Sequence, residues 1–225
     1  MPADAKRMFK SAISVLLMWG CYCAGAGRLD LWPGFAYAGF VLAGGLAAVW
    51  LMRTASPELL KERSSLHAGT KRWDIPLVLW IALLGPLSTC LVAGLDARFH
   101  GVRAADWTVF AGYFLGLAGV GIMLAAMGAN RFFSTVVRIQ TDRGHAVVDT
   151  GPYAVVRHPG YVGMLLTTIG TPFILASNWA WIPCAITVAV VLVRTALEDG
   201  TLRRELSGYE DFTTQTRSRL IPGIW

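Results

Sequence analysis

The sequence has 225 residues, of which 55% are hydrophobic and only 15% are charged, and its mean hydropathy is +0.51. Apolar runs near the length of a bilayer crossing exclude an ordinary soluble domain and predict an integral membrane protein. The net charge of +6 and the pI near 9.4 fit contact with anionic lipid headgroups, whereas no basic stripe with interleaved aromatic residues indicates a nucleic-acid partner.

Six apolar runs are predicted to be transmembrane helices, so the expected fold is an all-α, polytopic integral membrane protein. The runs cover about residues 9–27, 35–52, 75–95, 107–129, 161–177 and 180–197. Only Ser177, Asn178 and Trp179 separate the last two runs, and we therefore expect a tight helical hairpin there. The first run follows basic residues as a signal peptide does, but its length and its lack of a small-residue cleavage site favour a retained helix.

The basic residues fall almost entirely on one side of this predicted topology. With the N-terminus inside, 17 of the 20 Lys and Arg residues lie in the inner segments, and an odd number of spans would destroy this agreement. We therefore expect both termini to lie in the cytoplasm. The high Ala, Gly and Arg content favours a bacterial inner membrane as the location.

Residues 1–129 are interpreted as a four-span membrane scaffold, whose Gly-rich and Ala-rich helices can pack closely in lipid. Within it, residues 54–74 are predicted to form an interfacial connector, in which Ser56 and Pro57 suit the start of a short helix and Trp73 suits the headgroup zone. Neither half of the sequence repeats the other, which makes a transporter with inverted repeats less favoured but leaves it open. No spacing of Cys and His predicts a metal site.

Residues 130–225 are interpreted as the functional core, which consists of an inner-face loop, the last helical hairpin and an amphipathic, basic C-terminal helix. The loop is about thirty residues long and contains nearly every polar group that a site needs. Loops of this length in compact proteins are more often functional than idle, and the aromatic and aliphatic content of this one argues against disorder. Gly208 is expected to end or bend the first helix of the tail.

The end of the loop, residues 151–163, combines prolines, tyrosines and glycines around an Arg-His pair. Pro152 and Pro159 disfavour helix at the residues before them, so we expect an extended chain between them that presents backbone groups to a ligand. Gly160 and Gly163 would allow close approach, and the tyrosine rings suit an adenine or a sulfonium. The simpler alternative is that these residues only form a tight turn into the next helix.

Arg194 and Glu198 lie one helical turn apart at the inner end of the last span. Ionisable residues at that depth usually have a partner or a function. Two structural alternatives are an ion pair between these two residues and an arginine that reaches the lipid headgroups.

Together these features resemble the isoprenylcysteine carboxyl methyltransferase family over about residues 130–225. The resemblance is carried by residues 151–163, the following hairpin, Arg194-x-x-x-Glu198-Asp199, residues 205–212 and the segment from 219 to 222. The Arg-His-Pro-x-Tyr-x-Gly core is also similar to phospholipid N-methyltransferases and to the cofactor half of membrane sterol reductases, so that core alone indicates a fold and not a substrate. The acidic pair and the C-terminal segment favour a methyltransferase.

This resemblance implies S-adenosyl-L-methionine as the cofactor, in a pocket roofed by the inner-face loop and the C-terminal tail and open to the membrane for a lipid-like acceptor. The implied cofactor contacts are Gln140, His145, Ala146, Val147, Val148, Tyr153, His158, Pro159, Gly160, Tyr161 and Glu198. Arg194 would orient the acceptor carboxylate as the catalytic residue. Asp199 stands where many members of the family carry a second Glu, and the spacing from Gln140 to His145 is shorter than in some of them.

The function that we expect is methyl transfer to a membrane-borne isoprenoid or lipid-linked acceptor, with carboxyl O-methylation favoured. A sulfonium methyl is already activated, so positioning and removal of water would suffice for catalysis, and a carboxylate acceptor needs no general base. Three alternatives stay open: phospholipid N-methylation, an NADPH-dependent reductase of the same fold, and a non-catalytic membrane transporter.

Overall fold

The computed structural model of the chain describes residues 3–54, 59, 62, 69–102 and 105–225. In these residues the chain forms helices and irregular loops and no β-strand. Five helices are long and apolar enough to cross a membrane by length and composition, which supports an integral membrane protein. They are Met8–Ala26, Trp32–Thr54, Asp74–His100, Trp107–Ala129 and Trp181–Glu205. Helix α7 (Pro159–Ile174) has 16 residues and is not one of the five, so the sixth span stays a prediction.

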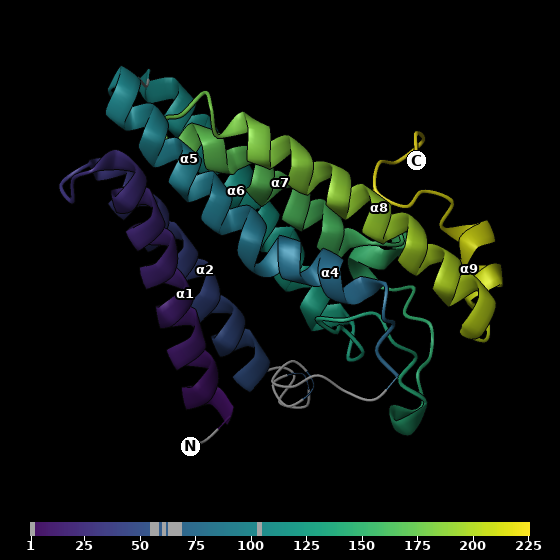
Figure 1. Ribbon diagram of the computed structural model, residues 1–225. Helices are drawn as coiled ribbons and strands as arrows, with labels where there is room; N and C mark the ends of the chain where they lie inside the picture. The colour runs from purple at the N-terminus through teal and green to yellow at the C-terminus, as the bar shows by residue number, and fades with distance from the viewer. Residues whose placement is uncertain (1–2, 55–58, 60–61, 63–68, 103–104) are drawn as a thin grey trace.

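The long helices run in alternating directions along the chain (Figure 1). Helices α1 (Ala3–Ala26) and α2 (Trp32–Thr54) form one hairpin, and α6 (Asp106–Ala129) is followed by the loop that leads to α7 and α8 (Trp181–Glu205). The N-terminus, this loop and the short helix α9 (Tyr209–Gln215) consequently gather at one end of the bundle (Figure 1). We call this the inner end, because it holds the basic segments; the side of a membrane that it faces stays a prediction.

A widened turn interrupts the third long helix. It begins as α4 (Asp74–Leu79), passes through the π-helical turn η1 (Trp80–Leu84) and continues as α5 (Gly85–His100). The cause is Pro86, which has no N–H to donate and whose ring would clash with the carbonyl four residues earlier in a regular helix. The Gly85 N–H accordingly donates to the Trp80 carbonyl, five residues back.

Glycines allow neighbouring helices to touch backbone to backbone. A Cβ atom on Gly119 of α6 would lie 2.5 Å from the carbonyl oxygen of Gly163 on α7, and one on Gly170 would lie 2.7 Å from that of Gly112. The α1–α5 pair is equally close, because a Cβ on Gly94 would lie 2.1 Å from a carbonyl oxygen of α1. Such contacts hold helices together in lipid, where apolar burial alone drives little association. The expected close packing is present at these glycines, whereas a Cβ on Gly39, Gly121 or Gly128 would meet nothing within 4 Å.

A buried carboxylate fixes the turn between α7 and α8. Asp96 of α5 accepts hydrogen bonds from the Ser177 hydroxyl at 2.7 Å and from the Trp179 backbone N–H at 3.1 Å. His100, one turn further along α5, contacts the other carboxylate oxygen at 2.9 Å. The turn is tight, with Ala176 in the left-handed region at φ 52°. The predicted helical hairpin is therefore present, and it returns α8 to the inner end.

The connector between α2 and α4 is described at only some of its positions. Ser56 and Pro57, where a short helix is predicted, lie outside the described residues. Leu59 is buried with Met52 of α2 and Met127 of α6, so this part of the connector packs against the inner end of the bundle.

Candidate active site

A cavity of about 520 Å³ extends from the inner end of the bundle to the space between the helices. Its inner part is lined by the loop, α8 and the tail, including Asn130, Arg138, Gln140, His145, Tyr153, His158, Glu198 and Tyr209. The second part, which we call the arm, is lined by helical residues, including Tyr37, Phe40, Val78, Ile81, Gly85, Thr89, Met123, Thr171 and Thr187. Ligand sites usually combine such an apolar wall with a few convergent polar groups, in volumes of roughly 300–1,000 Å³.

Hydrogen bonds inside the loop give the inner part its shape. The buried Gln140 side chain donates to the Phe132 carbonyl at 2.6 Å and accepts from Arg143 at 2.6 Å. The Gln140 backbone N–H donates to Nδ1 of His145 at 3.2 Å, and the His145 ring lies 4.7 Å from the Phe132 ring. The amide of Gln140 thus shapes the loop, although the residue also lines the cavity.

His145 is neutral at pH 7 in this arrangement. Burial, together with the nearby positive charges of Arg138 and Arg143, lowers the pKa of His145 to about 4. Its Nδ1 accepts the backbone N–H of Gln140, so the ring proton belongs on Nε2. The site therefore holds an imidazole that can donate one hydrogen bond.

The segment before α7 differs from the expected extended chain. Gly151 has φ 60°, and Gly151–Ala154 form the 3-10 helix η3 with Pro152 in its first turn. The prediction is wrong here because the fixed φ of proline suits the first turn of a helix as well as an extended chain. Tyr153 is buried as a result, and its hydroxyl accepts a hydrogen bond from the Asn130 side chain at 3.2 Å.

The expected close approach at the glycines is present, but toward the protein's own chain. A Cβ on Gly160 would lie 2.7 Å from the Phe133 ring, and one on Gly163 would lie 2.5 Å from the Gly119 carbonyl. These glycines seat the start of α7 against the loop and against α6. Pro159 is buried at the first position of α7.

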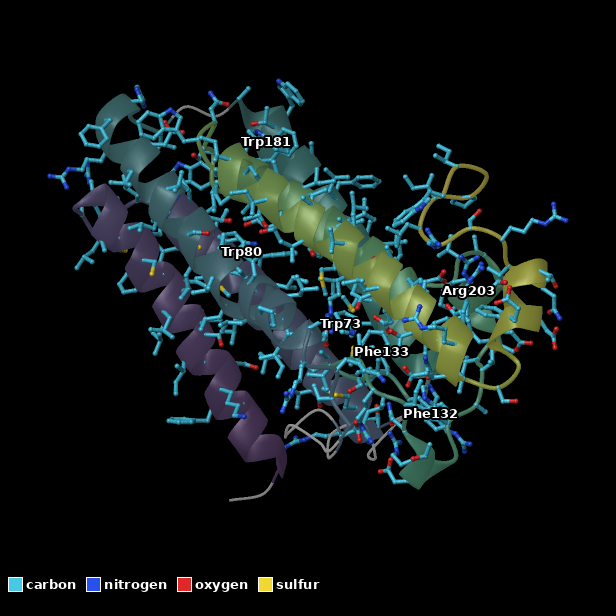
Figure 2. The ribbon with its side chains drawn as sticks, turned by 45° about the vertical axis from the view of Figure 1, so that its right-hand side comes forward. Trp73, Trp80, Phe132, Phe133, Trp181 and Arg203 are labelled. Carbon is cyan, nitrogen blue, oxygen red and sulfur yellow. The ribbon has the colours of Figure 1, made fainter. Side chains whose placement is uncertain are left out.

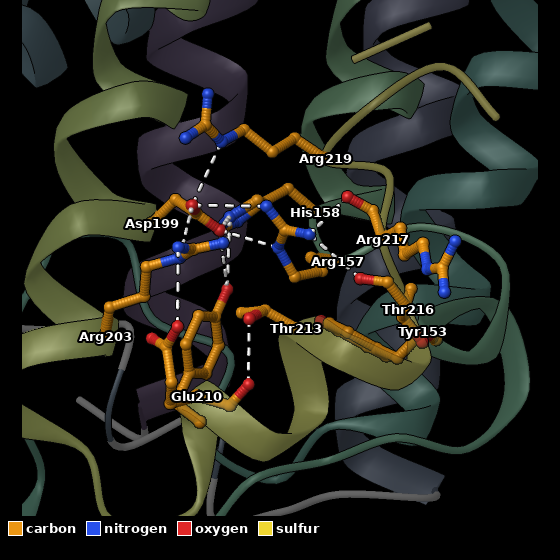
Figure 3. A network of polar contacts seen from close by, with 11 residues as sticks. Tyr153, Arg157, His158, Asp199, Arg203, Glu210, Thr213, Thr216, Arg217 and Arg219 are labelled. Atoms are coloured by element: carbon orange, nitrogen blue, oxygen red, sulfur yellow. Dashed lines mark hydrogen bonds and ion pairs between the residues drawn. The ribbon is translucent and has the colours of Figure 1, made fainter. Parts of the chain in front are cut away.

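Asp199 is the centre of a buried polar junction, shown in Figure 3. Its carboxylate, with no exposed surface, accepts from Nε of Arg157 at 2.7 Å, Nε of Arg219 at 3.0 Å and the Tyr209 hydroxyl at 3.1 Å. His158 lies 3.3 Å from the same carboxylate. One acidic side chain thereby joins α8, the Arg-His pair before α7, and the C-terminal tail.

The Arg-His pair also binds the tail through its backbone. The N–H groups of Arg157 and His158 donate to the carbonyls of Ser218 and Arg219 at 2.9 and 3.0 Å, and Nη1 of Arg157 donates to the Thr216 carbonyl at 2.9 Å. Sequence reasoning missed this function of Arg157. A buried arginine requires a partner, but the partner of Arg157 is Asp199, 42 residues away, so no local sequence signal indicates the pair.

Gly208 has φ 81° and separates α8 from α9, as expected for a residue that ends or bends the first tail helix. The turn brings Leu206, Tyr209 and Phe212 against the loop, where they line the cavity. Figure 2 shows Phe132 and Phe133 at the same end of α8 as Arg203, and Trp181 at the opposite end. The loop and the tail therefore enclose the inner part of the cavity.

Arg194 and Glu198 do not form the ion pair that their spacing permits. Arg194 pairs with Asp74 at the start of α4, through Nε at 2.7 Å and Nη2 at 3.0 Å. Glu198 accepts a hydrogen bond from the Tyr161 hydroxyl. The guanidinium carbon of Arg194 lies 5.4 Å from the centre of the Tyr161 ring, which adds a cation–π contact. Each charge is held by a different helix.

The structure brings nearly all of the sequence-predicted site residues to one cavity. The residues that line it are Gln140, His145, Ala146, Val147, Val148, Tyr153, His158, Gly160, Tyr161, Arg194 and Glu198. Pro159 does not line the cavity and supports it from within α7.

Residues 113–204 match the model of the isoprenylcysteine carboxyl methyltransferase (ICMT) family. The chain is 32% identical over 105 residues to a probable protein-S-isoprenylcysteine O-methyltransferase of Oryza sativa subsp. japonica. The aligned region covers 43% of this chain and 52% of that protein. It is 30% identical over 110 residues to the protein-S-isoprenylcysteine O-methyltransferase of Schizosaccharomyces pombe. That aligned region covers 44% of this chain and 47% of the relative. The matches thus span about half the length of these relatives.

A solved structure shares the fold. The eukaryotic intramembrane Ras methyltransferase ICMT, solved without a monobody, superposes with a TM-score of 0.62 at 22% sequence identity, over 84% of this chain and 67% of that one. The resemblance predicted from the motif is therefore confirmed. The family match begins further toward the N-terminus than predicted, within α6, and ends at residue 204, before the predicted segments 205–212 and 219–222.

Proposed function

We propose that this chain is a methyltransferase that uses S-adenosyl-L-methionine to methylate the carboxylate of a membrane-borne isoprenoid or lipid-linked acceptor. The observation that carries the proposal is the single cavity that joins polar loop residues at the inner end to an arm among the helices. A water-soluble cofactor can enter the first part and a lipid-like acceptor the second. The names of the similar proteins support the same reaction class.

The residues of the inner part fit the proposed cofactor. In the described part of the chain, no backbone–backbone hydrogen bond involves residues 146–148, which line the cavity, so their N–H and C=O groups are available to an adenine edge. The Nε2–H of His145 supplies another donor. The half-buried carboxylate of Glu198 suits the ammonium of the cofactor's amino-acid end.

The cofactor supplies, when bound, a methyl group already activated on a sulfonium. The contribution of the chain is to bind and orient the acceptor. Arg194 suits a carboxylate, because Nη1 of its guanidinium is a charged donor that the hydrogen bonds to Asp74 and Thr135 do not use. No proton has to leave a carboxylate before it attacks, so no side chain needs to act as a base. The loop and tail that enclose the inner part would exclude water from the reacting groups.

The enzymatic alternatives make different demands on the same cavity. An amine acceptor would have to lose a proton, and an arginine beside it would repel its protonated form. We therefore favour carboxyl methylation over phospholipid N-methylation. We also propose that the inner end faces the cytoplasm of a bacterial cell, where the cofactor and the basic segments would meet.

Cofactor binding is the first test. Calorimetry on the purified protein in nanodiscs should detect S-adenosyl-L-methionine binding and no comparable NADPH binding. The reverse result would establish the reductase alternative, and binding of neither would favour a non-catalytic membrane protein.

The product bond is the second test. The protein is incubated with methyl-labelled cofactor and a small S-prenylated cysteine that carries a free carboxylate, and the product is treated with alkali. An ester releases its label as methanol under alkali, whereas a methylated amine keeps it. Label that resists alkali would contradict carboxyl methylation.

A further inference from the structure

Asp74 is buried completely and pairs with a residue 120 positions later in the chain. It is the first residue of α4, and both of its carboxylate oxygens are occupied. Oδ1 accepts from Nε of Arg194 at 2.7 Å, while Oδ2 accepts from Nη2 of Arg194 at 3.0 Å and from the Val137 backbone N–H at 2.7 Å. A carboxylate with no exposed surface is stable only when it is fully paired in this way.

The pairing uses one edge of the guanidinium and leaves one nitrogen free. Nε and Nη2 face Asp74, and Nη2 also donates to the Thr135 carbonyl at 2.8 Å. In the described part of the chain, Nη1 makes no hydrogen bond. Arg194 lines the cavity, and the Tyr161 ring fixes its plane from one side. The orientation of Nη1 is therefore set by Asp74.

Asp74 also keeps Arg194 apart from Glu198. The two residues are four positions apart on α8, a spacing at which an Arg and a Glu can pair. Both line the cavity, so a pair between them would remove a positive and a negative group from the site together. Asp74 holds the first and Tyr161 the second. The Nη1 donor of Arg194 and the Glu198 carboxylate thus remain available to separate groups of a ligand.

The same helix forms part of the wall of the arm. Val78, Ile81 and Gly85 follow Asp74 along α4 and η1 and into α5, and all three line the cavity. An acceptor whose tail lies in the arm would therefore be aligned by the element that also orients Arg194.

We infer that Asp74 is a positioning residue for carboxyl methylation, which directs the Nη1 side of Arg194 toward the acceptor carboxylate. The inference rests on the proposed function, because it takes a carboxylate as the group that Arg194 binds. Asp74 lies outside the segment matched by the family model and outside the motif.

The test compares an S-prenylated cysteine with its neutral carboxamide, which has the same shape but no charge. In nanodiscs, the wild-type protein should bind the carboxylate roughly 10- to 100-fold more tightly than the amide, as expected for hydrogen bonds to a charged group. Asp74→Asn keeps an oxygen for the Val137 N–H but cannot pair with two N–H groups of Arg194. This variant should lose the preference for the carboxylate, while amide binding and the cofactor Kd stay within twofold of wild type.

Glu205→Gln is the matched control. Lys71, three residues before Asp74, forms an exposed ion pair with Glu205 at 2.7 Å, which also ties this segment to α8. Breaking that pair should leave the preference unchanged, because it does not touch Arg194. If Asp74→Asn does not fold, Arg194→Lys provides the same comparison, since a lysine that pairs with Asp74 has no second nitrogen for the acceptor.

The outcomes separate this inference from the proposed function. A folded Asp74→Asn protein that keeps the wild-type preference, or whose amide binding or cofactor binding also weakens well beyond twofold, overturns the positioning role. An Arg194→Lys protein that keeps the preference overturns it as well. A wild-type protein that binds the cofactor but does not methylate the carboxylate overturns the proposed function, and the inference with it.

Discussion

Replacement of Asp199 by asparagine tests whether the junction in Figure 3 holds the C-terminal tail against the site. The substitution keeps the size of the side chain but removes its charge and one acceptor oxygen. Arg157, whose side chain is 3% exposed, donates to both carboxylate oxygens, at 2.7 and 3.2 Å, and can keep at most one of these two hydrogen bonds in the variant. The hydrogen bonds from Arg219 and Tyr209 compete for the remaining oxygen.

The size of the effect follows from the burial of Arg157. Removal of one partner of a buried ion pair costs about 3–5 kcal/mol, because the other charge is left uncompensated. For a chain of this length, each kcal/mol lowers the melting temperature by roughly 2–4 °C. We therefore expect Asp199→Asn to melt about 6–20 °C below wild type. The tail should also detach more often, because its carbonyls are held by the same arginine.

Thermal unfolding in detergent and limited proteolysis of the tail measure these two effects. Glu210→Gln serves as the control, since Glu210 is exposed and contacts Arg203 at 3.6 Å, an exposed pair worth at most about 1 kcal/mol. If Asp199→Asn matches wild type in both measurements, or if the control is equally destabilised, the junction does not anchor the tail.

Three other predictions concern the site and the packing around it. Glu198→Ala should weaken S-adenosyl-L-methionine binding about 10- to 100-fold in calorimetry. Arg194→Ala should instead mainly lower the turnover of a carboxylate acceptor. Equal cofactor affinity in the two variants would contradict the assignment of Glu198. In the folded protein the pKa of His145 is lowered to about 4 from 6.5. Between these two pH values the unfolded chain therefore binds more protons than the folded chain. The stability that neutral His145 contributes is accordingly present above pH 6.5 and lost as pH falls to about 4. His145→Asn should flatten this part of a melting profile against pH, and an unchanged profile would show that another group is responsible. Gly163→Ala places a methyl 2.5 Å from a backbone oxygen and should lower the melting temperature, while Gly121→Ala, with open space around its Cβ, should not.

The sequence predicts those parts of the fold that depend on local chemistry. Hydropathy places the helices, and α8 extends to Glu205, past the predicted end at residue 197, because a helix can continue beyond the apolar segment that crosses lipid. His158 and Tyr161 could be assigned to one site from the motif, since both lie within two residues of Pro159, whose φ angle is fixed.

Contacts between distant segments could not be predicted in this way. Nothing near Asp74 in the sequence indicates that it pairs with Arg194, because the pair forms only when α4 packs beside α8. The spacing of Arg194 and Glu198 left a local ion pair open as one alternative, and tertiary packing provides each residue with a different partner. The fixed φ of Pro152 is compatible with two conformations, and the chain adopts the helical one, in which Tyr153 is buried.

The widened turn at Trp80–Leu84 also sets the direction in which one end of this helix faces relative to the other end. Each residue of a regular helix turns the chain by 100°, so one residue more or less between Asp74 and Thr89 rotates one end of this helix by more than a quarter turn relative to the other. Asp74 must face Arg194 while Thr89, fifteen residues later, faces the arm of the cavity. A chain shortened by one residue in this turn would keep its hydropathy and its motif, yet the two ends of the site would no longer face the same ligand.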